Sequence, residues 1–298
     1  MPVWLAMEVP VWLVMEVALV TGRSMPAPDL EMPLLVAALD GRGVRGVVVP
    51  WGEPFDWSSV PLVLVRSPWD YFRHLEAFLG WAEQVERVTT LVNPASVLSW
   101  NSHKRYLTAL ADHGVPTVPT SWVGRGASTE VRRSELAAHR GEVVIKPAVS
   151  VGAIGAFRGP AGSVEAGEHL AGLVAKGDAL VQPFQAVVLD EGELSLVYLG
   201  GAFSHAVRKV PVPGDYRVQV HYGGRVRPHQ PTGRQRHVAE AALAIVPAPV
   251  SYARVDMVGE HDPVIMELEL IEPELFLRHR PGAPRRFAEH LVGLLSAR

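Results

Sequence analysis

An alternation of short apolar runs and amphipathic stretches between Val17 and Asn93 constrains the fold of this chain more than any other feature of the sequence. Runs of this length, separated by stretches with helical spacing, are typical of βαβ units and therefore of a parallel sheet. The segments concerned are residues 17–20, 34–39, 46–49, 62–65 and 72–85. The pattern predicts an α/β domain in the first third of the chain.

The remaining two thirds of the sequence mix strand and helix patterns, which predicts an α+β architecture. Residues 102–113 carry apolar side chains at helical spacing and are followed by Gly114 and Pro116, which typically end a helix. Further helices are expected at residues 130–139, 164–174, 235–246 and 286–295. Strands are expected at residues 121–123, 143–146, 179–184, 252–258 and 264–270, with a hairpin of 194–199 and 202–207 joined by Gly200 and Gly201.

The start of the chain contains a short repeat, because residues 2–9 (PVWLAMEV) recur as residues 10–17 (PVWLVMEV) with seven of eight positions identical. Two such short copies are too few for a solenoid. Either the domain starts at Met15, with residues 17–20 as its first strand, or the preceding residues add an edge element; we favour the first interpretation. Acidic residues and a proline interrupt the apolar start and no basic residue precedes it, so we expect neither an export signal nor a membrane span.

Composition excludes several classes of chemistry. The length of 298 residues suggests about two domains. With 28 basic and 31 acidic side chains, the net charge of −3 gives no basic field for nucleic acid. The absence of cysteine excludes thiolate nucleophiles, cysteine-bound metals and disulfides, and it fits a cytoplasmic enzyme. Neither a His-Glu-x-x-His motif nor a Gly-x-Ser-x-Gly motif occurs, so the chemistry is expected to rest on carboxylates, amines, guanidinium groups or a bound cofactor.

Lysine is scarce in this sequence, and two of its four lysines stand at informative positions. Lys104 lies at the start of a predicted helix, and Lys146 ends an apolar strand, where an ammonium is costly unless it meets an anion. One interpretation is that both bind an anionic ligand. The other is that Lys146 extends to solvent from the strand end while Lys104 lies on a solvated helix face.

A loop of small residues follows Lys146. Residues 150–156 include Ser150, Gly152 and Gly155, and small side chains allow backbone N–H groups to approach a phosphate closely. The loop matches neither the Walker motif nor the dinucleotide fingerprint. It therefore predicts a phosphate-binding loop or, alternatively, a plain turn between strands.

Three carboxylates lie on two predicted neighbouring strands near the C-terminus. Glu267 and Glu269 are two residues apart and therefore point to the same face, and Asp256 lies in the preceding apolar strand. Carboxylates gathered on one face repel unless a cation lies between them, which predicts a Mg²⁺ site. The alternative is an exposed strand face on which Arg254 pairs with these acids.

In this order and at these distances, the two lysines, the small-residue loop, the strand at 180–184 and the three carboxylates resemble the ATP-grasp superfamily of ligases. The resemblance covers residues 93–274. It implies an ATP-grasp fold of mixed α/β and α+β class. The expected parts are an N-terminal α/β domain on the substrate side (residues 1–97), a lid lobe with the phosphate loop (98–182) and a C-terminal lobe with the metal carboxylates (183–298), the two lobes enclosing ATP.

The resemblance also implies roles for individual residues. The residues expected to hold ATP are Lys104, Lys146, Ser150, Gly152 and Gly155 at the phosphates, Gln182 and Phe184 at adenine, Asp190 (or Glu191) at the ribose, and Glu193 as a further acid. Asp256, Glu267 and Glu269 are expected to bind Mg²⁺. The family pattern ends in Glu-x-Asn, so Glu269 adds a negative charge here. The catalytic candidates are Arg217, which precedes Gly223 and Gly224, and Arg254, with Arg208 as a further possibility.

Two short segments, residues 66–71 (RSPWDY) and 269–276 (ELIEPELF), are similar to the glutathione-synthetase-like branch of the superfamily. This branch includes the cyclo-ligase that closes O-ureido-D-serine to D-cycloserine. The implied pocket for a small amino-acid substrate consists of Arg66, Trp69, Asp70, Tyr71 and Glu272. For Trp69 and Tyr71 the alternative is core packing at the start of a helix.

The activity implied by the resemblance is ATP-dependent activation of a carboxylate as an acyl phosphate, which a nitrogen nucleophile of the same molecule then attacks. ATP and Mg²⁺ are the expected cofactors and a small amino acid is the expected partner, with no nucleic acid and no membrane. Two alternatives stay open: a ligase that joins two separate amino acids, and an ATP-binding scaffold without catalysis. The sequence leaves the oligomeric state open.

Overall fold

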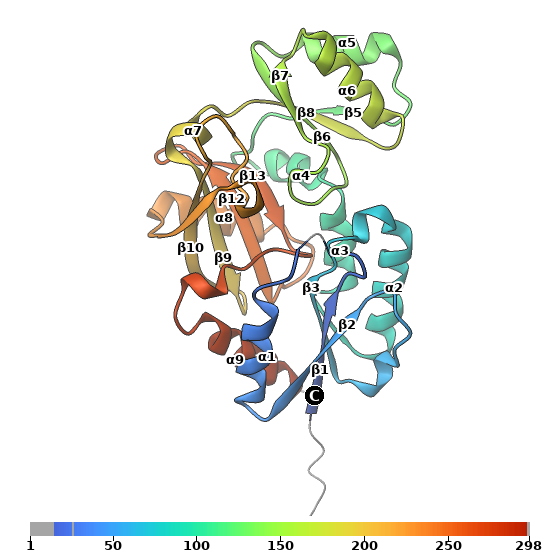
Figure 1. Ribbon diagram of the computed structural model, residues 1–298, viewed down its shortest axis with the longest axis vertical. Coiled ribbons are helices and arrows are strands. Elements are labelled where there is room, and N and C mark those ends of the chain that lie inside the picture. Colours follow the sequence, from blue (N-terminus) through green and yellow to red (C-terminus); the bar gives the residue numbers. More distant parts are fainter. Residues whose placement is uncertain (1–14, 26, 297–298) are drawn as a thin grey trace, which may run out of the picture.

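The computed structural model describes residues 15–25 and 27–296. These residues form three β-sheets, each covered by its own helices (Figure 1). A parallel sheet forms the N-terminal domain, and two antiparallel sheets form a lid lobe and a C-terminal lobe. This is the predicted combination of α/β and α+β architecture. Within the described residues, no helix has both the length and the apolar character needed to cross a bilayer.

The N-terminal sheet has the strand order β2-β1-β3-β4, and all of its strand pairs are parallel. Its elements are β1 (Met15–Thr21), α1 (Met32–Asp40), β2 (Val44–Pro50), β3 (Leu62–Ser67), α2 (Leu75–Val88) and β4 (Thr90–Val92), with short 3₁₀ turns at Trp57–Ser59 and Tyr71–Arg73. The central strands β1 and β3 are buried on both faces, which explains their continuous apolar runs. The predicted βαβ pattern is therefore confirmed. The interpretation of the N-terminal repeat concerns residues 1–14, which lie outside the described residues.

The lid lobe is an antiparallel sheet of order β5-β8-β6-β7 with two helices on one face (Figure 1, top). Its elements are β5 (Ser121–Val123), α5 (Thr129–Ala137), β6 (Glu142–Pro147), β7 (Phe157–Pro160), α6 (Val164–Val174) and β8 (Ala179–Pro183). Apolar side chains of β6 and β8 pack against Leu136 of α5 and Leu170 of α6. Ser128 and Ser163 cap these helices by accepting hydrogen bonds from backbone N–H groups.

The C-terminal lobe is an antiparallel sheet of order β11-β10-β9-β12-β13. Its elements are α7 (Val187–Glu191), β9 (Glu193–Leu199), β10 (Ala202–Val210), the 3₁₀ turn Val220–Tyr222, β11 (Arg225–His229), α8 (Gly233–Leu243), β12 (Tyr252–Val258), β13 (Val264–Glu269), the 3₁₀ turn Leu277–His279 and α9 (Ala283–Ser296). Side chains of β9 alternate between the faces: Leu196 packs in the cluster of α8, and Val197 packs in the cluster of α9.

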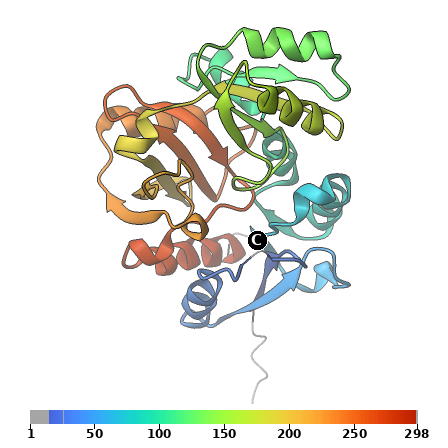
Figure 2. The same ribbon diagram turned by 45° about the horizontal axis from the view of Figure 1, so that its top comes forward.

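Helix α9 joins the C-terminal lobe to the N-terminal domain. It runs beside α1 in both views (Figures 1 and 2), and Phe287 and Leu291 share one buried cluster with Leu35 of α1 and Leu199 of β9. Because this cluster is continuous across the two parts, the N-terminal domain and the C-terminal lobe form one packed body.

The segment between the N-terminal domain and the lid differs from the prediction. The helix predicted over 102–113 is confirmed only as α4 (Tyr106–Asp112), and a second helix, α3 (Ala95–Ser102), precedes it. His103 is extended between them, with φ of −114° and ψ of 125°. This interruption places Lys104 outside both helices, beside the lid.

Candidate active site

Lys104 connects three parts of the chain. Its Nζ lies 3.0 Å from the carbonyl oxygen of Ser150 in the small-residue loop and 3.0 Å from Oε1 of Glu267 on β13. Its backbone N–H donates a hydrogen bond of 2.9 Å to the carbonyl of Ala148. The structure therefore brings together the first lysine, the phosphate-loop candidate and one of the metal-ligand candidates.

Lys146 faces the same cluster from the end of β6. It is half-buried, and among the described residues no carboxylate forms an ion pair with it. Burial lowers the pKa of Lys146, against the opposing effect of Glu267. A half-buried ammonium without a paired anion fits a ligand that brings its own negative charge.

The loop at 150–156 turns between β6 and β7. Gly152 and Gly155 have φ of +56° and +74°, a left-handed conformation that residues with a Cβ rarely adopt. At Gly155 a Cβ would also lie 3.0 Å from the ring of Pro147. Val151 packs in a buried cluster of the N-terminal domain, so the loop lies where the lid meets that domain.

Asp256 lies in the most highly charged part of this region. Its carboxylate accepts hydrogen bonds from Ser195 Oγ (2.6 Å), Lys209 Nζ (3.1 Å) and Arg254 Nη2 (2.9 Å). Burial alone would raise the pKa of Asp256, but Arg254 and Lys209 hold it well below its ordinary value. Lys209 also pairs with Glu193, which connects that acid to the same cluster.

Strands β12 and β13 set the three carboxylates beside one another. Asp256 is opposite Glu267 in the strand register, and Arg254 is opposite Glu269. Burial raises the pKa of Glu269 to about 7, with Arg254 opposing this rise and Asp256 adding to it. Because burial is the main cause of this rise, the charged form of Glu269 is costly at this position even beside Arg254, and a bound cation would lower that cost.

The donor set fits Mg²⁺ that is shared with phosphates. No group of three His, Cys, Asp or Glu side chains in residues 15–25 and 27–296 forms a closed metal cage. Mg²⁺ commonly uses one or two protein carboxylates and fills its remaining positions with phosphate oxygens and water. Arg254 pairs with Asp256 and Glu269 as the alternative interpretation expected, but the side chains of these residues are largely buried and not on an exposed face.

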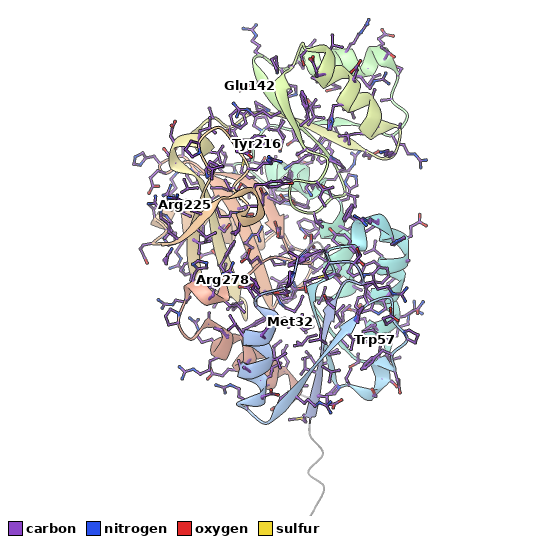
Figure 3. The ribbon with its side chains drawn as sticks, viewed as in Figure 1. Met32, Trp57, Glu142, Tyr216, Arg225 and Arg278 are labelled. Carbon is purple, nitrogen blue, oxygen red and sulfur yellow. The ribbon has the colours of Figure 1, made fainter. Side chains whose placement is uncertain are left out.

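The hinge between the lobes contains the residues predicted at adenine. Gln182 is buried and donates from Nε2 to Thr120 Oγ1 (2.9 Å), while the N–H of Phe184 donates to the carbonyl of Glu142 (2.9 Å). The guanidinium of Arg158 stacks 3.6 Å from the centre of the Phe184 ring. Arg158 also pairs with Glu142 of the lid (2.6 Å) and lies 5.6 Å from the ring centre of Tyr216 of the C-terminal lobe; Figure 3 labels both of these residues.

The three acids that follow the hinge, Asp190, Glu191 and Glu193, lie in different surroundings. Asp190 is exposed on α7. Glu191 accepts the backbone N–H of Glu260 (2.9 Å) and so ties α7 to the turn that follows β12. Glu193 lies beside Lys209, and burial raises the pKa of its carboxyl group.

Arg217 does not join the carboxylate cluster. It pairs with Asp215 (2.7 Å) and stacks 3.7 Å from the ring centre of Tyr222, in the loop between β10 and β11. Arg254, in contrast, lies within the cluster. The two catalytic candidates therefore occupy different places.

The two segments predicted for the substrate pocket contact each other. Trp69 Nε1 donates to the carbonyl of Glu272 (3.1 Å), and Arg66 Nη1 donates to the carbonyl of Pro273 (3.3 Å). Arg66 is only 1% exposed and also pairs with Glu31 (3.4 Å). Glu272 is half-buried; burial, and next the neighbouring Glu269, raise the pKa of its carboxyl group well above the ordinary value.

Asp70 and Tyr71 lie deeper than a pocket surface. Asp70 accepts hydrogen bonds from the N–H of Arg23 (2.8 Å) and from Trp51 Nε1 (2.9 Å), which fixes the loop after β1. Tyr71 is buried, with its ring centre 5.1 Å from that of Phe78. For Tyr71 the core-packing alternative agrees with this position.

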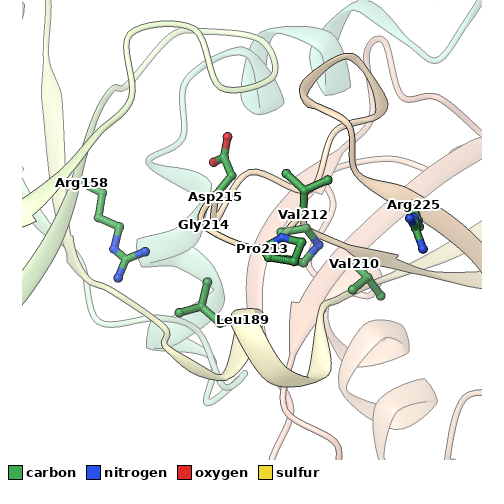
Figure 4. A pocket seen from close by; sticks show the side chains of 9 residues that line it. Arg158, Leu189, Val210, Val212, Pro213, Gly214, Asp215 and Arg225 are labelled. Carbon is green, nitrogen blue, oxygen red and sulfur yellow. The ribbon is translucent and has the colours of Figure 1, made fainter.

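A cavity of about 600 Å³ opens between the lid and the C-terminal lobe (Figure 4). Arg158 and Arg225 contribute positive charge to its lining and Asp215 contributes negative charge. None of the predicted site residues lines this cavity.

Several residues that position the site were missed from the sequence. Asn93, which ends the alternating apolar pattern, is fully buried, and its amide donates to the carbonyls of Tyr252 (3.0 Å) and Leu270 (2.9 Å). Asn101 donates to the carbonyl of Leu268 and accepts the N–H of Leu270, each at 2.8 Å. The scarcity of lysine could have drawn attention to Lys209, but nothing in the sequence pattern marks the asparagines.

Known proteins with similar sequences and structures identify the family of this chain. A family model described as the N-terminal domain of D-cycloserine synthetase DcsG matches residues 17–93. The cycloserine biosynthesis protein DcsG of Streptomyces lavendulae is 34% identical over 290 residues, which cover 92% of this chain and 97% of that protein. The crystal structure of D-cycloserine synthetase DcsG aligns with a TM-score of 0.85 at 32% identity, covering 94% of this chain and 99% of that one.

A more distant structure has the same fold with nucleotide and metal bound. The ATP-grasp ligase PsnB, complexed with a precursor variant, Mg and ADP, aligns with a TM-score of 0.65 at 14% identity and covers 95% of this chain and 99% of its own. The match supports the ATP-grasp fold that the three sheets form. Given the identity and coverage with the Streptomyces protein, the chain belongs to the DcsG family of ATP-grasp ligases.

Proposed function

We propose that this chain closes O-ureido-D-serine to D-cycloserine in an ATP-dependent reaction. The observation that carries the proposal is the meeting of Lys104, the loop at 150–156 and Glu267 in one cluster between the lobes. A chain of the DcsG family with this cluster has cationic groups for a triphosphate and carboxylates for its metal in the same place.

In the proposed reaction a carboxylate oxygen of the substrate attacks the γ-phosphorus of ATP, and ADP leaves. The product is an acyl phosphate. The nitrogen bonded to the side-chain oxygen of the same molecule then attacks the acyl carbon, loses its proton, and inorganic phosphate leaves as the isoxazolidinone ring closes. Hydrolysis of the carbamoyl group by one water gives carbon dioxide and ammonia, which balances the reaction.

For the nucleotide we propose that Lys104 and Lys146 neutralise phosphate charge, while backbone N–H groups of the loop approach the phosphates. The half-buried ammonium of Lys146, with which no carboxylate of the described residues forms an ion pair, supports this assignment. The remaining proposed contacts are Ser150, Gly152 and Gly155 at the phosphates, Gln182 and Phe184 at adenine, and Asp190 or Glu191, together with Glu193, around the ribose.

Asp256, Glu267 and Glu269 are the proposed residues that hold Mg²⁺ together with phosphate oxygens. When bound, Mg²⁺ neutralises the charge that develops on the transferring phosphoryl group. The raised pKa of Glu269 supports the assignment, since a cation would stabilise its charged form.

Arg254 is our first candidate for stabilising the phosphoryl group and the acyl phosphate, because its guanidinium already lies between Asp256 and Glu269. Arg217 is the second candidate. It would reach the site only if the loop between β10 and β11 closed over it.

The substrate pocket is proposed at the contact between residues 66–71 and 269–276. Among the described residues, no side chain pairs with the carboxyl group of Glu272, which supports a role in binding the substrate ammonium. We propose that Trp69 forms a wall of the pocket. Arg66, Asp70 and Tyr71 would then support the pocket from behind, because each is buried against other residues.

The proposed parts of the chain are residues 1–97, which supply the substrate side, 98–182, which form the lid, and 183–298, which hold the metal. A cytoplasmic location is part of the proposal, since the reaction uses ATP and the sequence has no cysteine.

Phosphate release by the purified protein tests the proposal. With ATP, Mg²⁺ and O-ureido-D-serine alone, we expect phosphate together with cycloserine identified by mass. Release only when two different amino acids are offered together would identify an intermolecular ligase instead. Binding of ATP without phosphate release from any amino acid would identify a catalytically silent protein.

A further inference from the structure

The segment after β13 lies against the guanidinium of Arg254. The carbonyl of Glu274 accepts a hydrogen bond from Arg254 Nη1 (3.1 Å), and the ring centre of Phe276 is 5.6 Å from Arg254 Cζ. The other side of the guanidinium contacts Asp256 and Glu269. The orientation of Arg254 therefore depends on residues 274–277 as well as on the acids.

Phe276 in this segment has an unfavourable backbone conformation. Its φ is 50° and its ψ is 36°, and it is the one non-glycine residue with positive φ in the described part of the chain. A residue with a Cβ persists in this left-handed region only when its surroundings hold it there. Phe276 is 2% exposed, so the contacts that hold this conformation come from the surrounding protein and not from solvent.

Two buried side chains hold the backbone on either side of Phe276. Glu31, which precedes α1 in the N-terminal domain, accepts the N–H of Leu275 (2.7 Å) and, with its other oxygen, the N–H of Leu277. His205 Nε2 on β10 lies 3.0 Å from the carbonyl of Leu275. Because Glu31 is 2% exposed and its two oxygens reach both neighbours of Phe276, it fixes the turn from the opposite domain.

We propose that Glu31 is a positioning residue for Arg254. By holding Leu275 and Leu277 it keeps Phe276 in the left-handed conformation, and this keeps the Glu274 carbonyl and the Phe276 ring against the guanidinium. Packing of the N-terminal domain and orientation of Arg254 are then coupled. The inference rests on the proposed function of Arg254 in phosphoryl transfer.

A double-mutant cycle tests this coupling. Glu31→Gln places an amide where a charged acceptor of backbone N–H groups stood, so we expect kcat to fall about tenfold, the value of one charged hydrogen bond. The KM for ATP should change by less than about twofold, because the substitution leaves the ATP contacts intact. In an Arg254→Lys background, Glu31→Gln should lower kcat by less than about twofold, since the group it positions is gone.

The matched control is Glu86→Gln. Glu86 also accepts a backbone hydrogen bond in the N-terminal domain, from Ala95 (3.0 Å), but contacts no residue of the turn. This variant should leave kcat unchanged. Thermal unfolding of each variant identifies any loss of kcat that comes from unfolded protein, and kcat is then expressed per folded molecule.

Hydrogen exchange of the Leu275 and Leu277 amides tests the same contact without turnover. We expect faster exchange at both amides in Glu31→Gln and unchanged exchange in Glu86→Gln. An equal loss of kcat from Glu31→Gln in both backgrounds, or unchanged exchange at the two amides, would overturn the inference. A wild-type protein that releases no phosphate would contradict the proposed function instead, and exchange would still decide whether Glu31 holds the turn.

Discussion

The two lysines beside the loop at 150–156 differ in the partners they have. Lys104 is 5% exposed and pairs with Glu267, so its removal would leave a largely buried carboxylate without a partner. Lys146 has no such partner among the described residues, and burial lowers its pKa. The charge of such a residue is costly in the folded chain but useful for binding an anionic ligand. Its substitution is therefore expected to weaken ligand binding without lowering stability.

Lys146→Met should therefore change binding and leave stability intact. We expect ATP affinity to fall at least about tenfold because an ammonium–phosphate contact is lost. The free energy of unfolding should stay within about 1 kcal/mol, since no carboxylate of the described residues forms an ion pair with Lys146. Calorimetric titration with ATP and urea unfolding measure both quantities. Lys176→Met, at an exposed lysine of the same lobe, should change neither, and equal ATP affinity in the two variants would contradict the assignment.

His205 makes the stability of the chain depend on pH. Burial lowers its pKa to about 4, below the 6.5 expected in the unfolded chain. Between these values the unfolded chain binds a proton that the folded chain does not, so stability falls as the pH is lowered. Urea unfolding should lose about 2 kcal/mol from this group between pH 7.5 and pH 5.

His205→Gln should reduce that loss, since glutamine can donate a hydrogen bond but does not titrate. His237→Gln, at an exposed position of α8, should keep the wild-type dependence. Identical pH dependence in wild type and His205→Gln would show that another group is responsible.

At the scale of elements, β13 is the strand on which the site depends most. The side chain of Asn101 bonds to the backbone on both sides of Glu269, and Tyr106 Oη accepts the N–H of Leu268 (3.2 Å). Residues 116–118 hold the strand further along through hydrogen bonds with Ile265. Side chains of Asn101 and Tyr106 and the backbone of residues 116–118 thus complete an edge that no further strand of the described sheet covers.

Asn101→Ala should weaken both the fold and the site. Two buried backbone groups lose their partner, so we expect a loss of about 2–4 kcal/mol in the free energy of unfolding. The concentration of Mg²⁺ needed for half-maximal activity should rise, because Glu269 is less firmly held. Ser102→Ala removes a hydrogen bond within the same helix and is the matched control. Unaltered Mg²⁺ dependence in folded Asn101→Ala would contradict this role.

The elements that could be predicted are those in which apolar residues recur at the spacing of a helix or a strand. Helix α6 and the β9–β10 hairpin have clear patterns, and both were predicted. Helix α3 was missed because its buried positions include the polar residues Asn101 and Ser102, which leave no apolar stripe. Strand β11 (RVRPH) was missed because it is a largely exposed edge strand with two arginines and a proline.

At the scale of the whole molecule, the candidate site combines residues of three parts of the chain: Lys104 contacts Ser150 of the lid and Glu267 of the C-terminal lobe, and Val151 packs against the N-terminal domain. The proximity of Lys104, Ser150 and Glu267 could be predicted, because the types and spacing of these residues point to one charged cluster. Contacts such as Glu31 with Leu275 and Trp69 with Glu272 join residues more than 200 positions apart. The sequence contains no periodic signal for such pairs, so the positioning contacts emerge only from the folded chain.

Isotope transfer tests the central claim, activation of the substrate carboxylate by ATP, most directly. The purified protein is given ATP, Mg²⁺ and O-ureido-D-serine labelled with ¹⁸O in the carboxylate, and the released phosphate is analysed by mass. The acyl-phosphate route predicts one ¹⁸O atom in each phosphate, because the oxygen that bridges carbon and phosphorus leaves with phosphorus. Phosphate without ¹⁸O, released alongside cycloserine, would contradict the account.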